Sequence, residues 1–333
     1  MRTITYKEAL REAIMEKIRE DKNVFMMGED IGVYGGAFGL SIGMLDEFGP
    51  ERILDTPMSE ASFTGVGVGA AIMGMRPIVE IMFSDFLTFG ADQIINQASK
   101  LRFMTGGQLK IPLVVRSPQG SGTGAASQHS QNVEGWFLNI PGLKIVAPSN
   151  PYDAKGLLKS SIEDDNPIIF LEHKLLYSTK GEVPEEDYRV PIGKSKVVRS
   201  GKDVTIVATS IMVKRSLEAA ETLGKEGIQV EIIDPRTLKP LDINPIVESV
   251  KKTHRLLVVY EGCTTGGIGG EIISQIGESK AFLYLDAPLF RLGGADIPIP
   301  YNLNLERKTV PQAEDIVSKA KEMVGGDWYA RIS

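Results

Sequence analysis

Short runs of β-branched and aliphatic residues alternate with amphipathic segments along most of the chain. In the first half these runs have the length of strands, and they lie at residues 24–27, 77–81, 112–115, 143–146 and 168–171. Segments between them, such as 91–104, carry the periodicity of helices. This alternation is typical of a parallel sheet with helices on both faces, whose ligands bind beyond the carboxyl ends of the strands.

Two local signals predict where helices begin. Residues 5–8 (Thr-Tyr-Lys-Glu) form a capping box ahead of an apolar stripe that runs from Ala9 to Ile18. Asn150 followed by Pro151 is typical of an N-cap and a first helical residue. We therefore expect amphipathic helices to begin at these two places.

The second half repeats the alternation after a polar, proline-bearing stretch at residues 182–191. Strand-like runs follow at 204–208, 230–233, 256–259 and 282–285, with helical patterns near 213–224, 267–278 and 310–324. The chain is therefore predicted to be an α/β protein of two domains, each a mainly parallel sheet flanked by helices. We place the first domain at residues 1–185, a linker at 186–197 and the second domain at 198–333.

Composition excludes several function classes. The 333 residues are 42% hydrophobic and 24% charged, and the net charge is −6. Because no basic stripe is available to neutralise phosphates, nucleic acid is not expected as a partner. No apolar run reaches the roughly 18 residues of a spanning helix, and no signal segment is evident, so we expect a cytoplasmic chain without a membrane partner. The single cysteine, Cys263, excludes an internal disulfide and a cysteine-based zinc site.

Glu60 is the first candidate for chemistry, because it ends the segment 55–60 shortly before the small-residue run 65–71. Small residues let backbones approach closely, so we expect this carboxyl, at the start of a helix, to be partly desolvated. Such a group holds or shares a proton near neutral pH and can act on a heteroaromatic nitrogen. A plainer interpretation stays open, in which Glu60 only complements the positive end of the helix.

The glycines of residues 65–70 also match the fingerprint of dinucleotide-binding folds, with Glu80 as a possible ribose acceptor. That fingerprint follows a strand directly, whereas here residues 57–64 separate the glycines from the strand that ends near Asp55. We therefore favour a buried helix whose glycines allow close packing on a neighbour.

A long glycine-rich loop at residues 117–131 contains His129 near its end. It has the character of a mobile lid that delivers an imidazole able to exchange protons near neutral pH. The alternative is a histidine that is simply hydrogen-bonded within the loop. For His173 and His254, a solvated surface position is expected.

Two aromatic residues, Phe83 and Phe86, follow the predicted strand at 77–81. Their rings could pack on a flat heterocycle, although such residues are more often part of the core.

Six segments taken together resemble the β subunit of thiamine diphosphate-dependent 2-oxo acid dehydrogenases. They are residues 28–32 (GEDIG), 55–60 (DTPMSE), 92–96 (DQIIN), 128–131 (QHSQ), 141–144 (PGLK) and 285–288 (LDAP). The resemblance extends nearly end to end, and residues 172–177 and 34–36 are most similar to bacterial pyruvate or acetoin members. It implies a transketolase-like pyrimidine-binding domain followed by a transketolase C-terminal-like domain.

The resemblance also implies roles for single residues. Glu60 is expected to hydrogen-bond N1′ of the aminopyrimidine of thiamine diphosphate, and the proton shared there activates the thiazolium ring. His129 is expected to face the reacting centre, where it steadies an oxyanion or protonates intermediates during acyl transfer. The cofactor-binding positions implied in this way are Glu29, Met58, Ser59, Glu60, Met82, Phe83 and Phe86.

Metal ions and partners follow from the same resemblance. The positions that match a family potassium site are Leu113, Ser161, Ile162, Asp164 and Asn166, several through main-chain carbonyls. Residues 28–30 are not the Gly-Asp-Gly motif through which thiamine enzymes bind magnesium, so an α subunit is expected to bring magnesium and the diphosphate ligands. The implied assembly has two α and two β subunits with a β–β contact, and it docks on a lipoyl-bearing dihydrolipoyl acyltransferase core.

The leading hypothesis is therefore the β subunit of the first component of a pyruvate or acetoin dehydrogenase complex. This oxidoreductase would cleave a C–C bond of its substrate and pass the acyl unit to a lipoyl group. The alternatives are a branched-chain 2-oxo acid dehydrogenase β subunit, an NAD-dependent oxidoreductase that uses residues 65–70, and a non-catalytic scaffold subunit.

Overall fold

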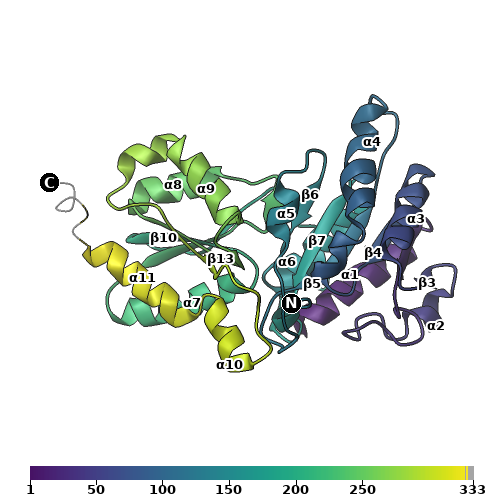
Figure 1. The fold of residues 1–333 in the computed structure, drawn as a ribbon, viewed down its shortest axis with the longest axis horizontal. Helices are drawn as coiled ribbons and strands as arrows, with labels where there is room; N and C mark the ends of the chain where they lie inside the picture. The colour runs from purple at the N-terminus through teal and green to yellow at the C-terminus, as the bar shows by residue number, and fades with distance from the viewer. Residues whose placement is uncertain (327, 329–333) are drawn as a thin grey trace. The chain divides into compact units, whose positions relative to one another are not determined.

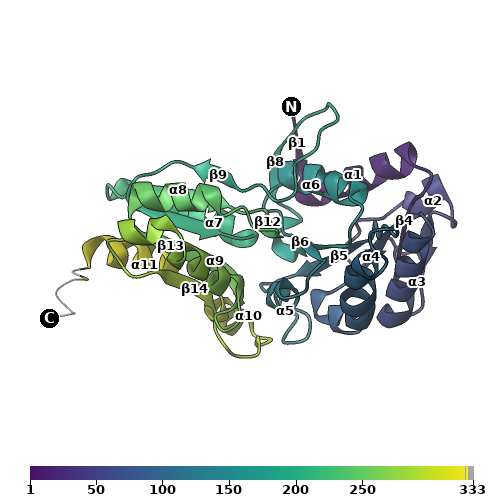
Figure 2. The ribbon, with the colours of Figure 1, turned by 90° about the horizontal axis from the view of Figure 1, so that it is seen from above.

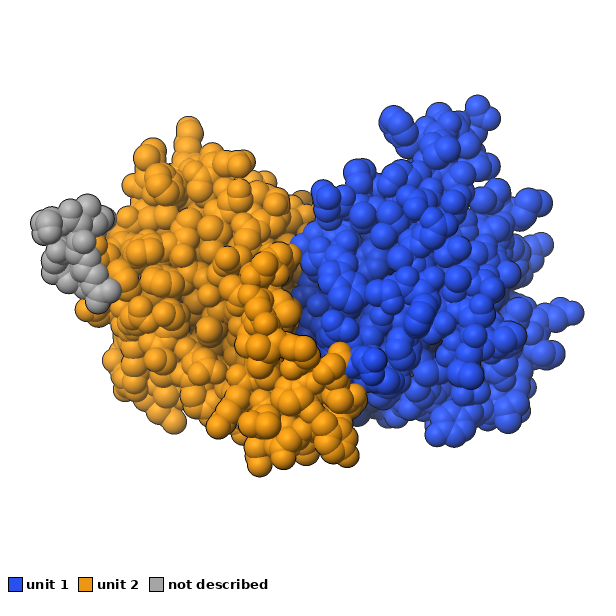
Figure 3. Space-filling view, viewed as in Figure 1, with its two compact units in different colours: residues 1–120, 128–192 blue, residues 121–127, 193–333 orange. Residues whose placement is uncertain are grey.

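A computed structural model describes residues 1–326 and residue 328. The chain forms two compact units, which Figure 3 distinguishes by colour. Unit 1 comprises Met1–Gly120 and Gln128–Ile192, and unit 2 comprises Ser121–Ser127 and Gly193–Ser333. Among the described residues, no helix is both long enough and apolar enough to cross a membrane.

The sheet of unit 1 is parallel throughout, and within this unit its strands lie in the order β6-β7-β5-β4-β2-β3. The strands are β2 (Val24–Gly28), β3 (Ile53–Asp55), β4 (Arg76–Glu80), β5 (Val114–Gln119), β6 (Lys144–Val146) and β7 (Ile168–His173). Every residue of β2, β5 and β7 is buried, as expected for strands covered on both faces. A separate antiparallel pair joins β1 (Arg2–Thr5) to β8 (Lys180–Val183).

Helices cover both faces of this sheet, with α1 and α6 on one side and α3 and α4 on the other (Figures 1 and 2). The α-helices of unit 1 are α1 (Tyr6–Glu20), α2 (Met44–Phe48), α3 (Glu60–Ile72), α4 (Ser99–Met104), α5 (Glu134–Leu138) and α6 (Pro151–Glu163). Shorter turns are the 3₁₀ helices η1 (Ser84–Thr88) and η3 (Lys174–Leu176) and the π-helix η2 (Gln93–Ala98).

Both predicted helix starts are confirmed. The Thr5 side chain accepts a hydrogen bond from the Glu8 N–H, and Glu8 completes the capping box. Asn150 accepts from the Asp153 N–H ahead of α6, with Pro151 as the first helical residue. These caps fix the register in which the two helices present their apolar faces to the sheet.

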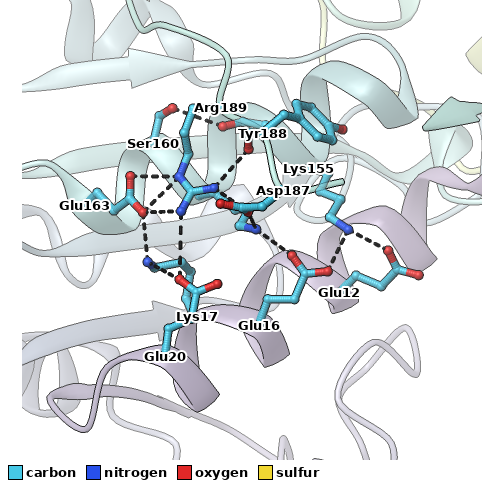
Figure 4. Close-up of polar contacts among 12 residues, drawn as sticks. Glu12, Glu16, Lys17, Glu20, Lys155, Ser160, Glu163, Asp187, Tyr188 and Arg189 are labelled. Carbon is cyan, nitrogen blue, oxygen red and sulfur yellow. Dashed lines mark hydrogen bonds and ion pairs between the residues drawn. The ribbon is translucent and has the colours of Figure 1, made fainter. Parts of the chain in front are cut away.

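The contact between α1 and α6 carries a network of ion pairs (Figure 4). Lys155 and Lys159 of α6 are 1% and 0% exposed, and they donate to Glu16 of α1 at 2.7 and 2.5 Å. The network extends to residues 187–189, where hydrogen bonds from Lys159 and Arg189 lower the pKa of Asp187 to about 2. Because buried lysines are costly unless they are paired, these contacts hold α1, α6 and residues 187–189 together.

Unit 2 is a second, smaller α/β unit with strands in the order β14-β13-β10-β11-β9. Its strands are β9 (Lys196–Arg199), β10 (Val204–Ala208), β11 (Val230–Asp234), β13 (Leu256–Cys263) and β14 (Phe290–Gly294), with a short β12 (Thr237–Lys239). Only β9 runs antiparallel to its neighbour. The helical elements are α7 (Ile211–Lys225), α8 (Asn244–Thr253), α9 (Ile268–Gly277), η4 (Lys280–Tyr284), α10 (Leu303–Glu306), η5 (Arg307–Thr309) and α11 (Ala313–Gly325). The predicted fold class, two mainly parallel sheets flanked by helices, is confirmed.

One predicted strand is wrong. Residues 282–285 do not form a strand, because Lys280–Tyr284 is the 3₁₀ helix η4, which begins where the Ser279 side chain accepts from the Ala281 N–H. The strand that pairs with β13 comes later, at β14. A short continuous apolar run does not reveal its period, so the sequence pattern cannot separate a buried strand from a helical turn.

Candidate functional site

The candidate residues of unit 1 lie after four neighbouring strands. Glu29 follows β2, Glu60 begins α3 after β3, Phe83 follows β4, and His129 lies in the segment after β5. The order β5-β4-β2-β3 makes these strands adjacent, and their parallel direction brings all four carboxyl ends to one edge of the sheet. This edge is where ligands of parallel α/β sheets bind.

Glu29 is a buried carboxyl at this edge. Glu29 is only 7% exposed, and its Oε1 has no hydrogen-bond partner among the described residues. Burial, together with the negative charges of Glu60 and Asp30, raises the pKa of Glu29 to about 7. Glu29 is therefore poised to exchange a proton near neutral pH.

Glu60 is partly buried. It is the first residue of α3, as expected, but the chain leaves it half-buried. The preceding Ser59 does not cap the helix with its side chain, and its Oγ instead donates to Ser62 Oγ at 2.7 Å. Since Glu60 contributes to the raised pKa of Glu29, the two carboxyls interact, and the stronger desolvation lies on Glu29.

The glycine run lies inside α3, and Gly67 explains why small residues are needed there. A Cβ at Gly67 would lie 2.7 Å from Val79 Cγ2 of β4, so the helix packs directly on the strand. This confirms the close-packing interpretation for Gly67, whereas a Cβ at Gly69 would meet nothing within 4 Å. The dinucleotide alternative is wrong on geometry, because the glycines do not form a turn after a strand and Glu80 is buried in an ion pair with Arg116.

That ion pair belongs to a buried cluster of four residues that sequence reasoning missed. Arg116 of β5 donates from Nε and Nη2 to the two carboxylate oxygens of Glu172 at 2.8 and 2.6 Å, and from Nη1 to Glu80. The Tyr177 hydroxyl donates to Glu172 Oε2 at 2.7 Å. Burial raises the pKa of Glu80 against the opposing effect of Arg116, and it also raises that of Tyr177.

The methionines and aromatic residues expected around the cofactor differ in exposure. Met58 is 88% exposed, whereas Met82, Phe83 and Phe86 are half-buried. The two phenylalanine rings meet edge to face with centroids 6.0 Å apart, and both also contact His129. They are therefore not sealed in the core, and they form part of an accessible apolar wall.

His129 packs against this wall. Its ring centroid lies 4.7 Å from that of Phe83 and 5.2 Å from that of Phe86, at interplanar angles of 79° and 80°. The Lys174 ammonium donates to the His129 carbonyl and lies 5.4 Å from the Phe83 ring centroid. Within the described part of the chain, the imidazole nitrogens make no hydrogen bond, so both are available to a ligand.

The loop before His129 makes several hydrogen bonds to carboxylates that are distant in the sequence. Ser121–Ser127 belongs to unit 2, where the Ser121 N–H and hydroxyl donate to Glu261 Oε1 at 2.6 and 2.9 Å. The N–H groups of Gly122 and Gly124 donate to the carboxylate of buried Glu306 at 2.7 and 3.0 Å. Charged acceptors make such bonds strong, and no local sequence pattern indicates that distant carboxylates hold this loop.

The surface position expected for His173 is also wrong, because the residue is 0% exposed. Its Nδ1 accepts from the Leu175 N–H at 3.2 Å, and a Cβ at Gly120 would lie 2.0 Å from its Nε2. Gly120 has a φ of +97°, a conformation that only glycine adopts readily. His254 is half-buried, and its Nδ1 lies 2.6 Å from the Tyr284 carbonyl oxygen.

The oxygens of the expected potassium site already serve other cations. Arg76 Nη1 donates to the carbonyls of Ile162 and Asp164 at 3.0 and 3.2 Å. Lys144 lies 2.5 Å from one Asp164 carboxylate oxygen, and Asn166 donates to the other. The guanidinium of Arg76 therefore meets two of the main-chain carbonyls that the resemblance assigns to a potassium ion.

Two further expected ligands make hydrogen bonds within the chain. Leu113 accepts from the Ile168 N–H at 2.9 Å through its carbonyl, and Ser161 donates to the Leu157 carbonyl at 2.7 Å. No group of three or more histidine, cysteine, aspartate or glutamate side chains in the described residues is arranged to hold a metal ion.

Buried polar atoms without partners gather after the same four strands. Among the described residues they include Glu29 Oε1 after β2, Thr56 Oγ1 after β3, Asp85 Oδ2 after β4 and Ser130 Oγ beside His129. A buried polar atom without a partner costs about 1–3 kcal/mol, which a polar ligand would relieve. The edge is thus chemically suited to a heteroaromatic ligand that carries both N–H donors and ring acceptors.

Comparison with known proteins agrees with this geometry. Residues 2–180 match the transketolase pyrimidine binding domain, and residues 193–316 match the transketolase C-terminal domain. The solved structure titled "Split gene transketolase, inactive beta4 tetramer" superposes with a TM-score of 0.80 at 23% identity, covering 96% of this chain and 98% of that one, and it shows the fold alone.

Two relatives are similar over nearly the whole chain. The pyruvate dehydrogenase E1 component subunit beta of Rickettsia felis is 46% identical over 96% of this chain and 98% of its own length. The mitochondrial pyruvate dehydrogenase E1 component subunit beta-1 of Oryza sativa subsp. japonica is 48% identical over 96% of this chain and 86% of its own length. The resemblance predicted from the sequence motifs is confirmed, and the chain belongs to the β-subunit family of thiamine diphosphate-dependent 2-oxo acid dehydrogenase E1 components.

Proposed function

We propose that this chain is the β subunit of a pyruvate dehydrogenase-type E1 enzyme, which works with an α subunit and passes an acetyl unit to a lipoyl group. The observation that carries the proposal is the pair of interacting carboxyls, Glu29 and Glu60, on the same sheet edge as the aromatic wall and His129. The names of the two relatives described above, both pyruvate dehydrogenase E1 β subunits, support pyruvate as the substrate.

Thiamine diphosphate fits the residues that are present. When bound, it supplies a nucleophilic thiazolium carbon that attacks a 2-oxo carbonyl. Glu60 would face N1′ of the aminopyrimidine, where a carboxyl group can donate or accept a hydrogen bond. Glu29 has a pKa of about 7 and interacts electrostatically with Glu60. Its Oε1, which has no partner among the described residues, would be available to the same aminopyrimidine ring. Met58, Ser59 and Met82 would line the same ring.

Phe83 and Phe86 exclude water from the reacting end of the site and hold the imidazole of His129 edge-on. Because its ring nitrogens are uncommitted, His129 donates a proton to, or accepts one from, an oxygen of the substrate during transfer to the lipoyl group. This imidazole is therefore needed more in acyl transfer than in C–C bond cleavage.

The other half of the site comes from the α subunit, which brings magnesium and the ligands of the diphosphate. In support, no Gly-Asp-Gly sequence occurs at residues 28–30 and the described residues hold no carboxylate cluster suited to a divalent ion. We further propose two α and two β subunits with a β–β contact, docked on a dihydrolipoyl acyltransferase core. In domain terms, residues 1–185 contribute the pyrimidine-binding part and residues 198–333 the C-terminal part, joined by 186–197.

The test is Glu60→Gln in the enzyme reconstituted with its α subunit. Glutamine keeps the size and loses the exchangeable proton, so we expect pyruvate decarboxylation with an artificial electron acceptor to be lost while assembly is retained. Glu51→Gln, at an exposed glutamate, is the matched control and should remain fully active. Near-full activity of Glu60→Gln would refute the catalytic role of Glu60 and would support a non-catalytic scaffold subunit instead. Assays with acetoin and branched-chain 2-oxo acids in place of pyruvate decide the substrate.

A further inference from the structure

The turn η1 contacts the His129 segment with more than its two phenylalanine rings. Ser84 Oγ donates to the Gln131 carbonyl at 3.0 Å. Asp85 Oδ1 accepts from both the backbone N–H of Gln131, at 3.3 Å, and its side-chain Nε2, at 2.8 Å. The residue two positions after His129 is therefore held at its N–H, its carbonyl and its side chain by one short turn.

Asp85 is placed unusually for a carboxylate. It lies in sequence between Phe83 and Phe86, it is 6% exposed, and its Oδ2 is buried without a hydrogen-bond partner among the described residues. Burying a carboxylate with one oxygen unsatisfied is unfavourable for folding. The structure shows two hydrogen bonds to this carboxylate, and Gln131 donates both of them.

The other side of His129 is fixed as well, because Lys174 donates to the His129 carbonyl. The imidazole ring meanwhile lies against Phe83 and Phe86, which flank Asp85. One rigid turn thus sets both the wall on which the ring packs and the backbone from which the ring projects. A shift of η1 would move the wall and the backbone of His129 together.

We propose that Asp85 is a positioning residue for His129, acting through Gln131. The inference rests on the proposed role of His129 in acyl transfer. Asp85 does not touch the substrate, and its effect on the reaction passes through the placement of the imidazole. Displacement of a reacting group by about 1 Å can cost up to about 100-fold in rate, so the loss of this contact has a measurable consequence.

A double-mutant cycle in the reconstituted enzyme tests the inference. Asp85→Ala, His129→Ala and the double variant are compared in lipoyl-domain acylation and in the artificial-acceptor assay, at saturating substrate, with assembly checked by size-exclusion chromatography. We expect Asp85→Ala to slow lipoyl acylation by about 10- to 100-fold and to affect the artificial-acceptor assay much less. The double variant should be no slower than His129→Ala alone, because no imidazole remains to be positioned.

The control cycle uses Asp153→Ala, which removes another fully buried aspartate of unit 1, in α6, that accepts a hydrogen bond from Asn150 Nδ2 at 2.6 Å. The fold-losses in acylation rate caused by Asp153→Ala and by His129→Ala should multiply in the double variant. Asp85→Asn keeps an oxygen acceptor for Gln131 and should recover most of the acylation rate. Gln131→Ala removes the side-chain donor to Asp85 but keeps the backbone N–H bond, and it should show the same non-additivity if Asp85→Ala fails to assemble.

The two possible failures are distinguishable. If His129→Ala slows acylation and Asp85→Ala multiplies that loss, the positioning role is overturned while the proposed role of His129 stands. If His129→Ala slows neither assay, or slows both equally, the acyl-transfer role of His129 is overturned and the positioning inference with it.

Discussion

Replacing Glu29 by glutamine should stabilise this chain, and the gain should depend on pH. The pKa of Glu29 is raised from 4.5 to about 7, so folding favours the protonated form. Below pH 4.5 the carboxyl is protonated in both states and its ionisation costs nothing. As the pH rises from about 4.5 to 7, the unfolded chain ionises while the folded one resists, and stability falls. Above pH 7 the folded state carries the full free-energy cost of ionising Glu29.

The magnitude follows from the same values. Each pH unit between the two pKa values corresponds to 1.36 kcal/mol, so the interval from 4.5 to about 7 amounts to roughly 3 kcal/mol at pH 8. Glutamine cannot ionise, so Glu29→Gln removes this cost and relieves the repulsion from Glu60 and Asp30. The gain should approach zero at pH 4.5 and level off above pH 7.

The assay is urea unfolding of the isolated chain and of Glu29→Gln at pH 5, 6, 7 and 8, with Glu51→Gln as an exposed control that should show no such trend. The difference in unfolding free energy between Glu29→Gln and the parent should grow with pH. A difference that is flat with pH, or a variant less stable than the parent at pH 8, would refute the assignment of a desolvated, protonated carboxyl to Glu29.

Two further substitutions test the packing beneath the site. Arg116→Met should destabilise the chain by about 3–5 kcal/mol, because it leaves the carboxylates of Glu80 and Glu172 buried without their cation. Chemical unfolding measures this loss. A loss below about 1 kcal/mol would contradict the buried cluster. Gly67→Val should lower the free energy of unfolding by about 1–3 kcal/mol, because its Cβ would lie 2.7 Å from Val79 Cγ2. Gly69→Val is the matched control, because a Cβ there meets nothing within 4 Å, and it should cost less.

Much of the fold was predictable because a strand covered on both faces reads as a continuous apolar run. This is why β2, β4 and β7 were located closely from the sequence, and why the caps at Thr5 and Asn150 located two helices. The same signal failed at residues 282–285, where an equally apolar run forms η4. Length and hydrophobicity alone do not tell a short strand from a helical turn.

The site was predictable in outline, because side chains that follow parallel strands must meet at one edge of the sheet. What the sequence could not show are the contacts made across long separations in the chain. Arg116 and Glu172 are 56 residues apart, and Glu306 holds Gly122 across 184 residues. The greater burial of Glu29 than Glu60 likewise depends on packing from several elements, which no local pattern records.

The central claim is that this chain contributes only part of a site that an α subunit completes. The most direct measurement is the rate of pyruvate decarboxylation by the purified chain with thiamine diphosphate and magnesium, while the purified α subunit is added stepwise. The account predicts no turnover by the chain alone, and activity that rises with added α subunit until the two are equimolar. Turnover of pyruvate by the chain alone, at a rate that the α subunit does not change, would contradict it.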